Sequence, residues 1–203
     1  MVRPVSNPSA HSQTSETTHD PAIPATWFLR RAAGYIELGE FLVNGDAPAP
    51  AAAKVVLRRA IEELGNLPES ERLGPAASLL EGEALRAAGE WEAAIGPFTR
   101  ALESGRGALE AWLGLGWCRK RLGDLPAAIA ALESGLAAFP RQAILLYNLA
   151  CYHSLAGDVP AAIENLTQAI TLDDRYRDLT GTERDFDPIR ADPRFQAATH
   201  VTV

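Results

Sequence analysis

From Ala25 onward, the chain consists of Ala- and Leu-rich stretches separated by Gly-Asp or Gly-Glu pairs. None of these stretches shows the alternation of apolar and polar residues, rich in β-branched side chains, that is typical of strands. A glycine followed by an acidic residue is suited to end one helix and begin the next, as a C-cap followed by an N-cap. The pattern therefore predicts an all-α chain of short helices joined by tight turns.

The Ala- and Leu-rich part is also self-similar. In-phase copies of 34 residues occupy three blocks, 75–108, 109–142 and 143–176. The last two blocks place Gly123-Asp124 opposite Gly157-Asp158, and each then continues with a Pro-Ala-Ala-Ile sequence. Small residues at the eighth and twentieth positions of a block would let two antiparallel helices approach closely, with bulky residues filling the space between them. One such hairpin leaves an apolar face open, which stacking of further hairpins closes.

This pattern resembles the tetratricopeptide repeat, whose signature is W-x2-L-G-x2-Y, then A-x3-F, then P. The block 109–142 matches best, with Arg119 in place of the usual Tyr, and its matching residues are Trp112, Leu115, Gly116, Ala128, Leu132 and Pro140. The blocks on either side match at Gly82, Ala94, Phe98 and Ala101, and at Leu149, Ala150, Ala162, Leu166 and Ala169. The resemblance implies a right-handed α-solenoid of antiparallel helix pairs, with one repeat in each of the three blocks.

A degenerate helix pair with an inserted loop is expected to precede the regular repeats, in residues 25–74. Leu38-Gly39-Glu40-Phe41 is similar to the turn at 88–91, and a helical pattern resumes at Ala51 after a loop signature of Asn, Gly, Asp and Pro. Residues 1–24 are dominated by Ser, Thr and Pro and are expected to form a disordered tail.

The C-terminal residues 177–203 are expected to form short capping helices over the last repeat. Asp187-Pro188 and Asp192-Pro193 are both cap-then-proline helix starts. A binding element is the alternative to a cap here. A separate irregularity is Gly96-Pro97, which falls inside an expected helix and predicts either a kink or a helix that starts late.

Composition narrows the class of function. The 203 residues carry a formal net charge of −7, which argues against nucleic acid or an anionic membrane as the main partner. The chain has no apolar run long enough to span a membrane and no signal peptide, and its two cysteines fit a reducing compartment, so a cytoplasmic protein is expected.

Signatures of catalysis are absent from the sequence. It contains no H-E-x-x-H, G-x-x-x-x-G-K-[ST] or G-x-S-x-G motif. The four histidines are scattered, and Cys151 and His153 are two residues apart, so on a helix they point in nearly opposite directions. We therefore expect no enzyme, no cofactor and no metal site.

The resemblance also implies where a ligand would bind. In tetratricopeptide proteins, positions 2, 5, 9, 12 and 13 of each first helix line a concave groove. In this chain the corresponding candidates are Leu79, Glu83, Arg86, Leu113, Trp117, Lys120, Arg121, Tyr147 and Cys151. An aromatic side chain at Trp117 beside two cations favours a peptide with apolar and acidic side chains. The alternative is that Trp117 packs partly against the neighbouring repeat.

These features predict a non-catalytic scaffold or adaptor that binds a protein or peptide segment in its concave groove. The Lys and Asn that other tetratricopeptide proteins use to clamp a terminal carboxylate are missing, because Leu113 and Trp117 stand in those places. A dedicated chaperone for a secreted or assembling protein, resembling acidic three-repeat secretion chaperones, is the alternative. An accessory domain of an enzyme is the third hypothesis.

Overall fold

The computed structural model describes residues 23–43, 48–103 and 108–200, and this part of the chain is helical without any strand. Its helices are α1 (Ala25–Phe41), α2 (Ala51–Gly65), α3 (Glu69–Arg72), α4 (Pro75–Ala88), α5 (Trp91–Glu103), α6 (Leu109–Arg121), α7 (Leu125–Ala138), α8 (Ala143–Ala156), α9 (Val159–Leu172), α10 (Arg175–Leu179), the 3₁₀ helix η1 (Arg184–Ile189) and α11 (Pro193–Thr199). The expected tail at 1–24 lies, except for its last two residues, outside the described part.

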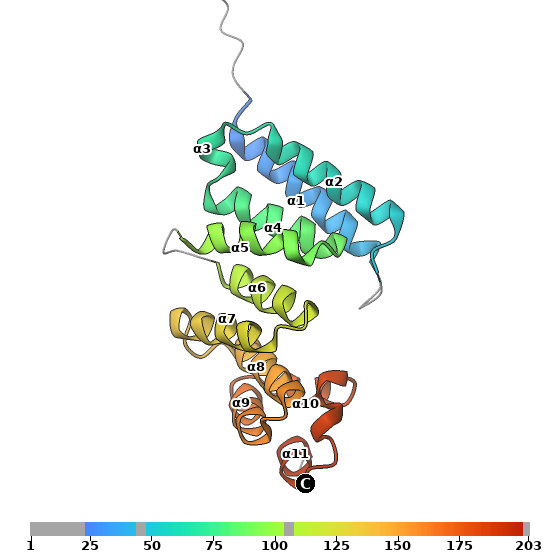
Figure 1. Cartoon of the computed structure of the whole chain (residues 1–203), viewed down its shortest axis with the longest axis vertical. Coiled ribbons are helices and arrows are strands. Elements are labelled where there is room, and N and C mark those ends of the chain that lie inside the picture. The colour runs from blue at the N-terminus through green and yellow to red at the C-terminus, as the bar shows by residue number, and fades with distance from the viewer. Residues whose placement is uncertain (1–22, 44–47, 104–107, 201–203) are drawn as a thin grey trace, which may run out of the picture.

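The long helices form antiparallel pairs that stack into an elongated array (Figure 1). The closest pairs are α1 with α2, α4 with α5, α6 with α7, and α8 with α9. Each second helix also packs on the first helix of the next pair, as α5 does on α6. This arrangement confirms the predicted all-α solenoid of helix pairs.

Close packing inside each pair depends on small residues facing large ones. A Cβ atom on Gly116 would lie 2.8 Å from Cδ2 of Leu132, which is fully buried. Gly135 approaches Trp112 in the same way, at 2.8 Å from a built Cβ to the Trp112 Cβ. The predicted packing roles of Gly116 and Leu132 are therefore observed.

The turns between paired helices use the predicted Gly-acid sequence. Gly89, Gly123 and Gly157 have φ between 78° and 81°, the left-handed region that glycine adopts without strain. Asp124 and Asp158 then cap the following helices, each accepting a hydrogen bond from a backbone N–H at 3.2 Å. A proline follows at the start of α7 and α9, where a missing N–H costs little.

The first helix pair departs from the prediction. No turn occurs at Gly39, because α1 continues to Phe41 and Gly39 packs inside the pair. A Cβ on Gly39 would lie 2.5 Å from Leu57, the contact that Gly116 makes with Leu132 in the regular repeat. Gly39 is therefore a small residue packed between α1 and α2, and α1 ends two residues after it.

The proline inside α5 does not delay the helix. α5 begins at Trp91 and runs through Pro97, so the expectation of a late start is wrong. Pro97 is buried beside Phe98, whereas Gly96 is exposed. The proline ring therefore contributes to the packed face of the helix in spite of the backbone hydrogen bond it removes.

The C-terminal helices fold back against the last pair. η1 packs on α8, while α10 and α11 contact α9. Phe186, Ile189 and Phe195 are buried there. Asp192 caps α11 as predicted, but Asp187-Pro188 does not begin a helix: it lies inside η1, and Glu183 provides the cap.

Candidate functional site

A groove of about 520 Å³ runs across the first helices of the array. Its walls come from α1, α4, α6 and α8, because α4 packs beside both α1 and α6 and brings their inner faces together. The lining residues are Ala33, Ile36, Glu37, Glu40, Leu80, Glu83, Arg86, Glu110, Leu113, Gly114, Trp117, Ile144 and Asn148. Most of the exposed lining is therefore aliphatic or aromatic, with carboxylates among it.

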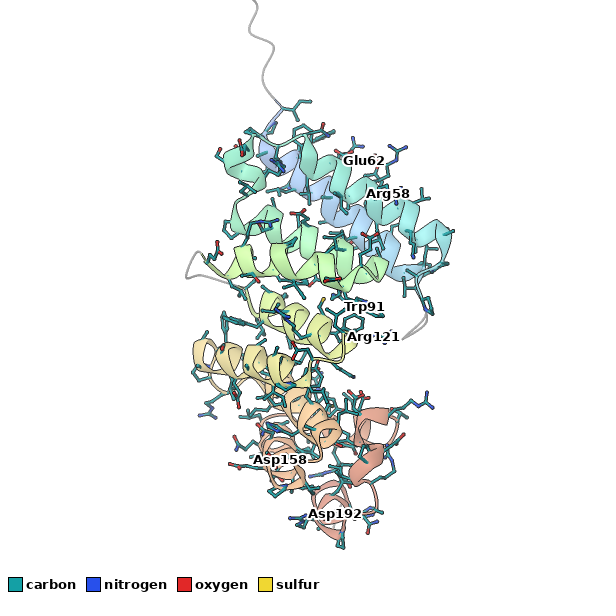
Figure 2. The ribbon with its side chains drawn as sticks, in the orientation of Figure 1. Arg58, Glu62, Trp91, Arg121, Asp158 and Asp192 are labelled. Carbon is teal, nitrogen blue, oxygen red and sulfur yellow. The ribbon has the colours of Figure 1, made fainter. Side chains whose placement is uncertain are left out.

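Trp117 lies at the junction of this groove with a smaller hollow of about 210 Å³. Its ring meets that of Trp91 edge to face, with centroids 6.0 Å apart. The guanidinium of Arg86 is 5.7 Å from the Trp117 ring, and that of Arg121 is 4.4 Å from the Trp91 ring and 5.2 Å from the Trp117 ring. Figure 2 shows Trp91 and Arg121 side by side near the end of α6. The two tryptophans and two arginines thus hold one another in place.

Arg86 is fixed by two carboxylates. Its Nε donates to Glu83 of the same helix at 2.8 Å. A terminal nitrogen of Arg86 lies 2.7 Å from an oxygen of Glu40, and this ion pair joins α4 to α1. Burial raises the pKa of Glu83 above its ordinary value, against the opposing effect of Arg86. Burial alone would lower the pKa of Arg86, but Glu83 and Glu40 raise it overall. Arg86 therefore stays charged and is neutralised locally.

The groove is acidic overall. Among the described residues, its charged lining consists of Glu37, Glu40, Glu83 and Glu110 and one cation, Arg86. Glu83 and Glu40 share Arg86, while Glu37 and Glu110 are exposed and form no ion pair within the described residues. A ligand in the groove therefore meets two uncompensated carboxylates, one on α1 and one on α6.

Five of the nine residues predicted for the groove lie together. Glu83, Arg86, Leu113 and Trp117 line the main groove, and Arg121 lines the adjoining hollow. Leu79 does not face the groove: it packs among the residues around Phe98. Its neighbour Leu80 lines the groove instead.

The other three predicted residues are covered by the C-terminal segment. Tyr147 and Cys151 are only 7% and 2% exposed, because η1 lies over this part of α8, and burial raises the pKa of the Cys151 thiol. Phe186 of η1 contacts the Tyr147 ring at a centroid distance of 5.6 Å. Lys120 forms an ion pair with Asp185 of η1. The prediction that Tyr147 and Cys151 line an open groove is therefore wrong, because both are buried. The prediction that Lys120 offers a cation to a ligand is also wrong, because Asp185 pairs with it.

The prediction missed the contribution of α1. Ala33, Ile36, Glu37 and Glu40 line the groove, but the predicted groove positions were applied only to the first helices of the three regular blocks. It also missed Glu110 and Ile144, which are the second residues of their blocks and could have been found from the implied groove positions.

Within the described residues, no group of three or more His, Cys, Asp or Glu side chains could hold a metal ion. None of the described helices combines the length and apolar character needed to cross a membrane.

The fold defines an α-solenoid with a groove along its first helices. A family model of the tetratricopeptide repeat matches residues 50–108, 79–143 and 119–177, more than half of the chain, so the chain belongs to the tetratricopeptide repeat family. Repeats of this family stack into extended concave surfaces that bind other proteins. No curated protein matches the sequence.

Solved structures agree on the fold. MamA from Desulfovibrio magneticus RS-1, from residue 41 to its end, is similar with a TM-score of 0.58 and 20% identity, over 83% of this chain and 89% of that one. A thermophilic tetratricopeptide protein of Thermus thermophilus, TTC0263, is similar with a TM-score of 0.55 and 20% identity, over 76% and 78% of the two chains.

Proposed function

We propose that this protein is a non-catalytic adaptor that binds a protein segment along its concave groove, and that the segment carries apolar and basic side chains. The observation that carries this proposal is the composition of the groove. Apolar side chains such as Trp117, Leu113 and Ile36 are combined there with the uncompensated carboxylates of Glu37 and Glu110.

Trp117 is the anchor of the proposed site. Large aromatic residues in partly desolvated pockets supply much of the binding energy at protein interfaces. Trp117 is half-buried, and its edge contact with Trp91 and the flanking arginines restrict its ring. A ring already held in position loses little conformational freedom when a ligand packs against it.

The electrostatics support a basic segment. The expectation of an acidic partner depended on Lys120 and Arg121 beside Trp117. Asp185 neutralises Lys120, and Arg86 is held between two carboxylates, so the groove itself is left acidic. Lysine or arginine side chains on the ligand would complement it and speed association.

The length of the site is limited at one end. η1 occupies the face of α8 around Tyr147 and Cys151, so the segment would lie across α1, α4 and α6 and reach only the start of α8, at Ile144 and Asn148. A short extended or helical segment suits this space better than a long one.

Selection of a random peptide library on the full chain tests the proposal. We expect enrichment of peptides that pair aromatic or aliphatic residues with Lys or Arg. Glu110→Lys, in the groove, should weaken binding of these peptides about tenfold or more. The matched control Glu133→Lys, on an exposed face of α7, should not. Acidic peptides, or equal losses in both variants, would contradict the proposal. In later capture experiments, an unfolded partner would favour the chaperone hypothesis over the adaptor.

A further inference from the structure

The outward face of α1 carries a stripe of exposed apolar side chains that no other described helix covers, although the Arg31 guanidinium lies 4.4 Å from the Trp27 ring. Trp27, Leu38 and Phe41 are 40%, 49% and 83% exposed. With Arg31 and Gly34 they follow one another at intervals of four, three, four and three residues, which places all of them on one face of the helix. Exposed large apolar side chains gathered in this way mark an interaction surface.

This stripe lies at the open end of the array. The opposite face of α1, with Ala32, Ile36 and Gly39, is buried in its own pair. No helix pair precedes α1 in the described chain, so its outward face has no neighbour there (Figure 1). α2, by contrast, turns charged side chains such as Arg58 and Glu62 outward (Figure 2). The exposed large apolar side chains of this pair therefore lie mainly on α1, with Val55 on α2.

Gly34, in the middle of the stripe, provides an independent observation. A glycine inside a helix is less favourable than alanine, so close packing is the usual compensation. In the described helices, large side chains approach the glycines at Gly39, Gly82, Gly114, Gly116 and Gly135. A Cβ on Gly34 would meet no atom within 4 Å. Within the described residues its small size therefore serves no packing contact, and it would allow close approach by a helix from outside.

We propose that α1 docks against α1 of a second copy of this chain, antiparallel and related by a two-fold axis at Gly34. The stripe is symmetric about this residue: Trp27 lies seven positions before it and Phe41 seven after. Two-fold pairing brings Trp27 of one copy to Phe41 of the other, twice, and places the two Gly34 backbones at the crossing point. Such a self-complementary contact is the common basis of homodimers.

The charged residues beside the stripe support a second copy of this chain as the occupant. Arg30 and Glu37 flank the stripe on the same edge of α1, seven residues apart, and both are exposed. Neither forms an ion pair within the described residues. Antiparallel pairing about Gly34 sets Arg30 of each copy against Glu37 of the other.

The oligomeric state of the full chain tests this proposal. Sedimentation over roughly a hundredfold range of concentration should show a monomer–dimer equilibrium. Arg30→Glu alone and Glu37→Arg alone should each weaken the dimer about tenfold or more, because each opposes like charges twice. The two single variants mixed together should form heterodimers, since both ion pairs are then restored with reversed sign. The double variant R30E/E37R should also dimerise.

A cysteine at the axis locates the contact. Gly34→Cys should give a disulfide-linked dimer under mild oxidation, because the axis brings the two side chains within bonding distance. The control Gly65→Cys, an exposed glycine at the end of α2 with open space around it, should not. The natural cysteines are buried, so the parent gives no background. A parent that is monomeric throughout, or charge variants that dimerise as the parent does, would overturn the proposal.

Discussion

At the scale of single residues, Phe98 links two repeats. Its fully buried ring lies between two glycines on different helices. A Cβ on Gly82 of α4 would be 2.7 Å from the ring, and one on Gly114 of α6 would be 2.3 Å from its Cζ. Both distances are too short for a real contact, so the glycines and the ring are fitted to one another.

We predict that Gly114→Ala destabilises the protein by about 1–3 kcal/mol, although alanine is the better helix former. The added methyl group must displace Phe98, which has no free space to move into because it is fully buried. Chemical denaturation measures the change. Gly65→Ala, with no atom within 4 Å of the new Cβ, is the control and should lose nothing. Equal stability of the two variants would mean that α5 and α6 are less closely packed than described.

A second prediction at this scale concerns pH. Burial raises the pKa of Glu83 in the folded protein above the 4.5 of an ordinary glutamate. A carboxyl group with a raised folded-state pKa binds protons on folding, so its contribution to stability is fully present below the unfolded pKa and is lost as the pH rises through the folded one. The parent should therefore gain stability relative to Glu83→Gln as the pH falls from neutral toward 4.5.

Denaturation of both proteins at a series of pH values gives this difference directly. The Gln variant is the reference because it keeps the shape of the side chain and cannot titrate. A parent that loses stability relative to Glu83→Gln over this interval would show that attraction to Arg86 outweighs burial.

At the scale of elements, η1 is held in the concave face by apolar and polar contacts together. Phe186 packs between Tyr147 and Phe195, with ring centroids at 5.6 Å and 5.3 Å. Ser154 on α8 donates a hydrogen bond to the backbone carbonyl of Asp185 at 2.7 Å. The Asp185 side chain pairs with Lys120 from the preceding repeat. The segment thus bridges α6 and α8 and fills the end of the groove.

Loss of Phe186 should loosen this element before the rest of the array. We expect Phe186→Ala to cost about 3–5 kcal/mol, because the removed ring is fully buried. The Cys151 thiol beneath η1 should then react with a thiol reagent much faster than in the parent. Cys118, buried in α6 in a different apolar cluster from Phe186 and Cys151, is the internal control and should keep its slow rate. Mass spectrometry of modified peptides separates the two rates, and equal acceleration of both would indicate global unfolding instead.

The sequence predicted the helices better than it predicted which distant segments pack against them. The 34-residue period predicts the regular helix pairs correctly, because each pair packs only if a small residue on one helix faces a large residue on the other. Gly116 and Leu132 are an example. Gly39 misled the prediction because a glycine before an acidic residue is the same signal whether it ends a helix or packs against one. Tyr147, Cys151 and Lys120 have the right positions for a groove, but their covering comes from η1, more than thirty residues later. A repeat pattern has no information about such distant contacts.

At the scale of the whole molecule, we propose binding at two different surfaces of the chain. The concave groove combines apolar and acidic side chains and is closed at one end by η1. The outward face of α1 is apolar and flanked by opposite charges. Because Glu37 lies near both, a dimer formed through α1 would pair this carboxylate with Arg30 of the second copy and leave Glu110 as the unpaired carboxylate of each groove. The dimer would also bring two grooves close together, so a partner with two binding segments would gain from avidity.

The measurement that most directly tests groove binding is calorimetric titration of a selected basic and apolar peptide into the parent and two variants. Trp117→Ala should lose about 2 kcal/mol of binding or more, roughly thirtyfold in affinity, because an aromatic anchor is removed. Val55→Ala, on the exposed face of α2, should bind as the parent does. Melting curves should show both variants folded. Unchanged affinity in folded Trp117→Ala, or an equal loss in Val55→Ala, would contradict the account.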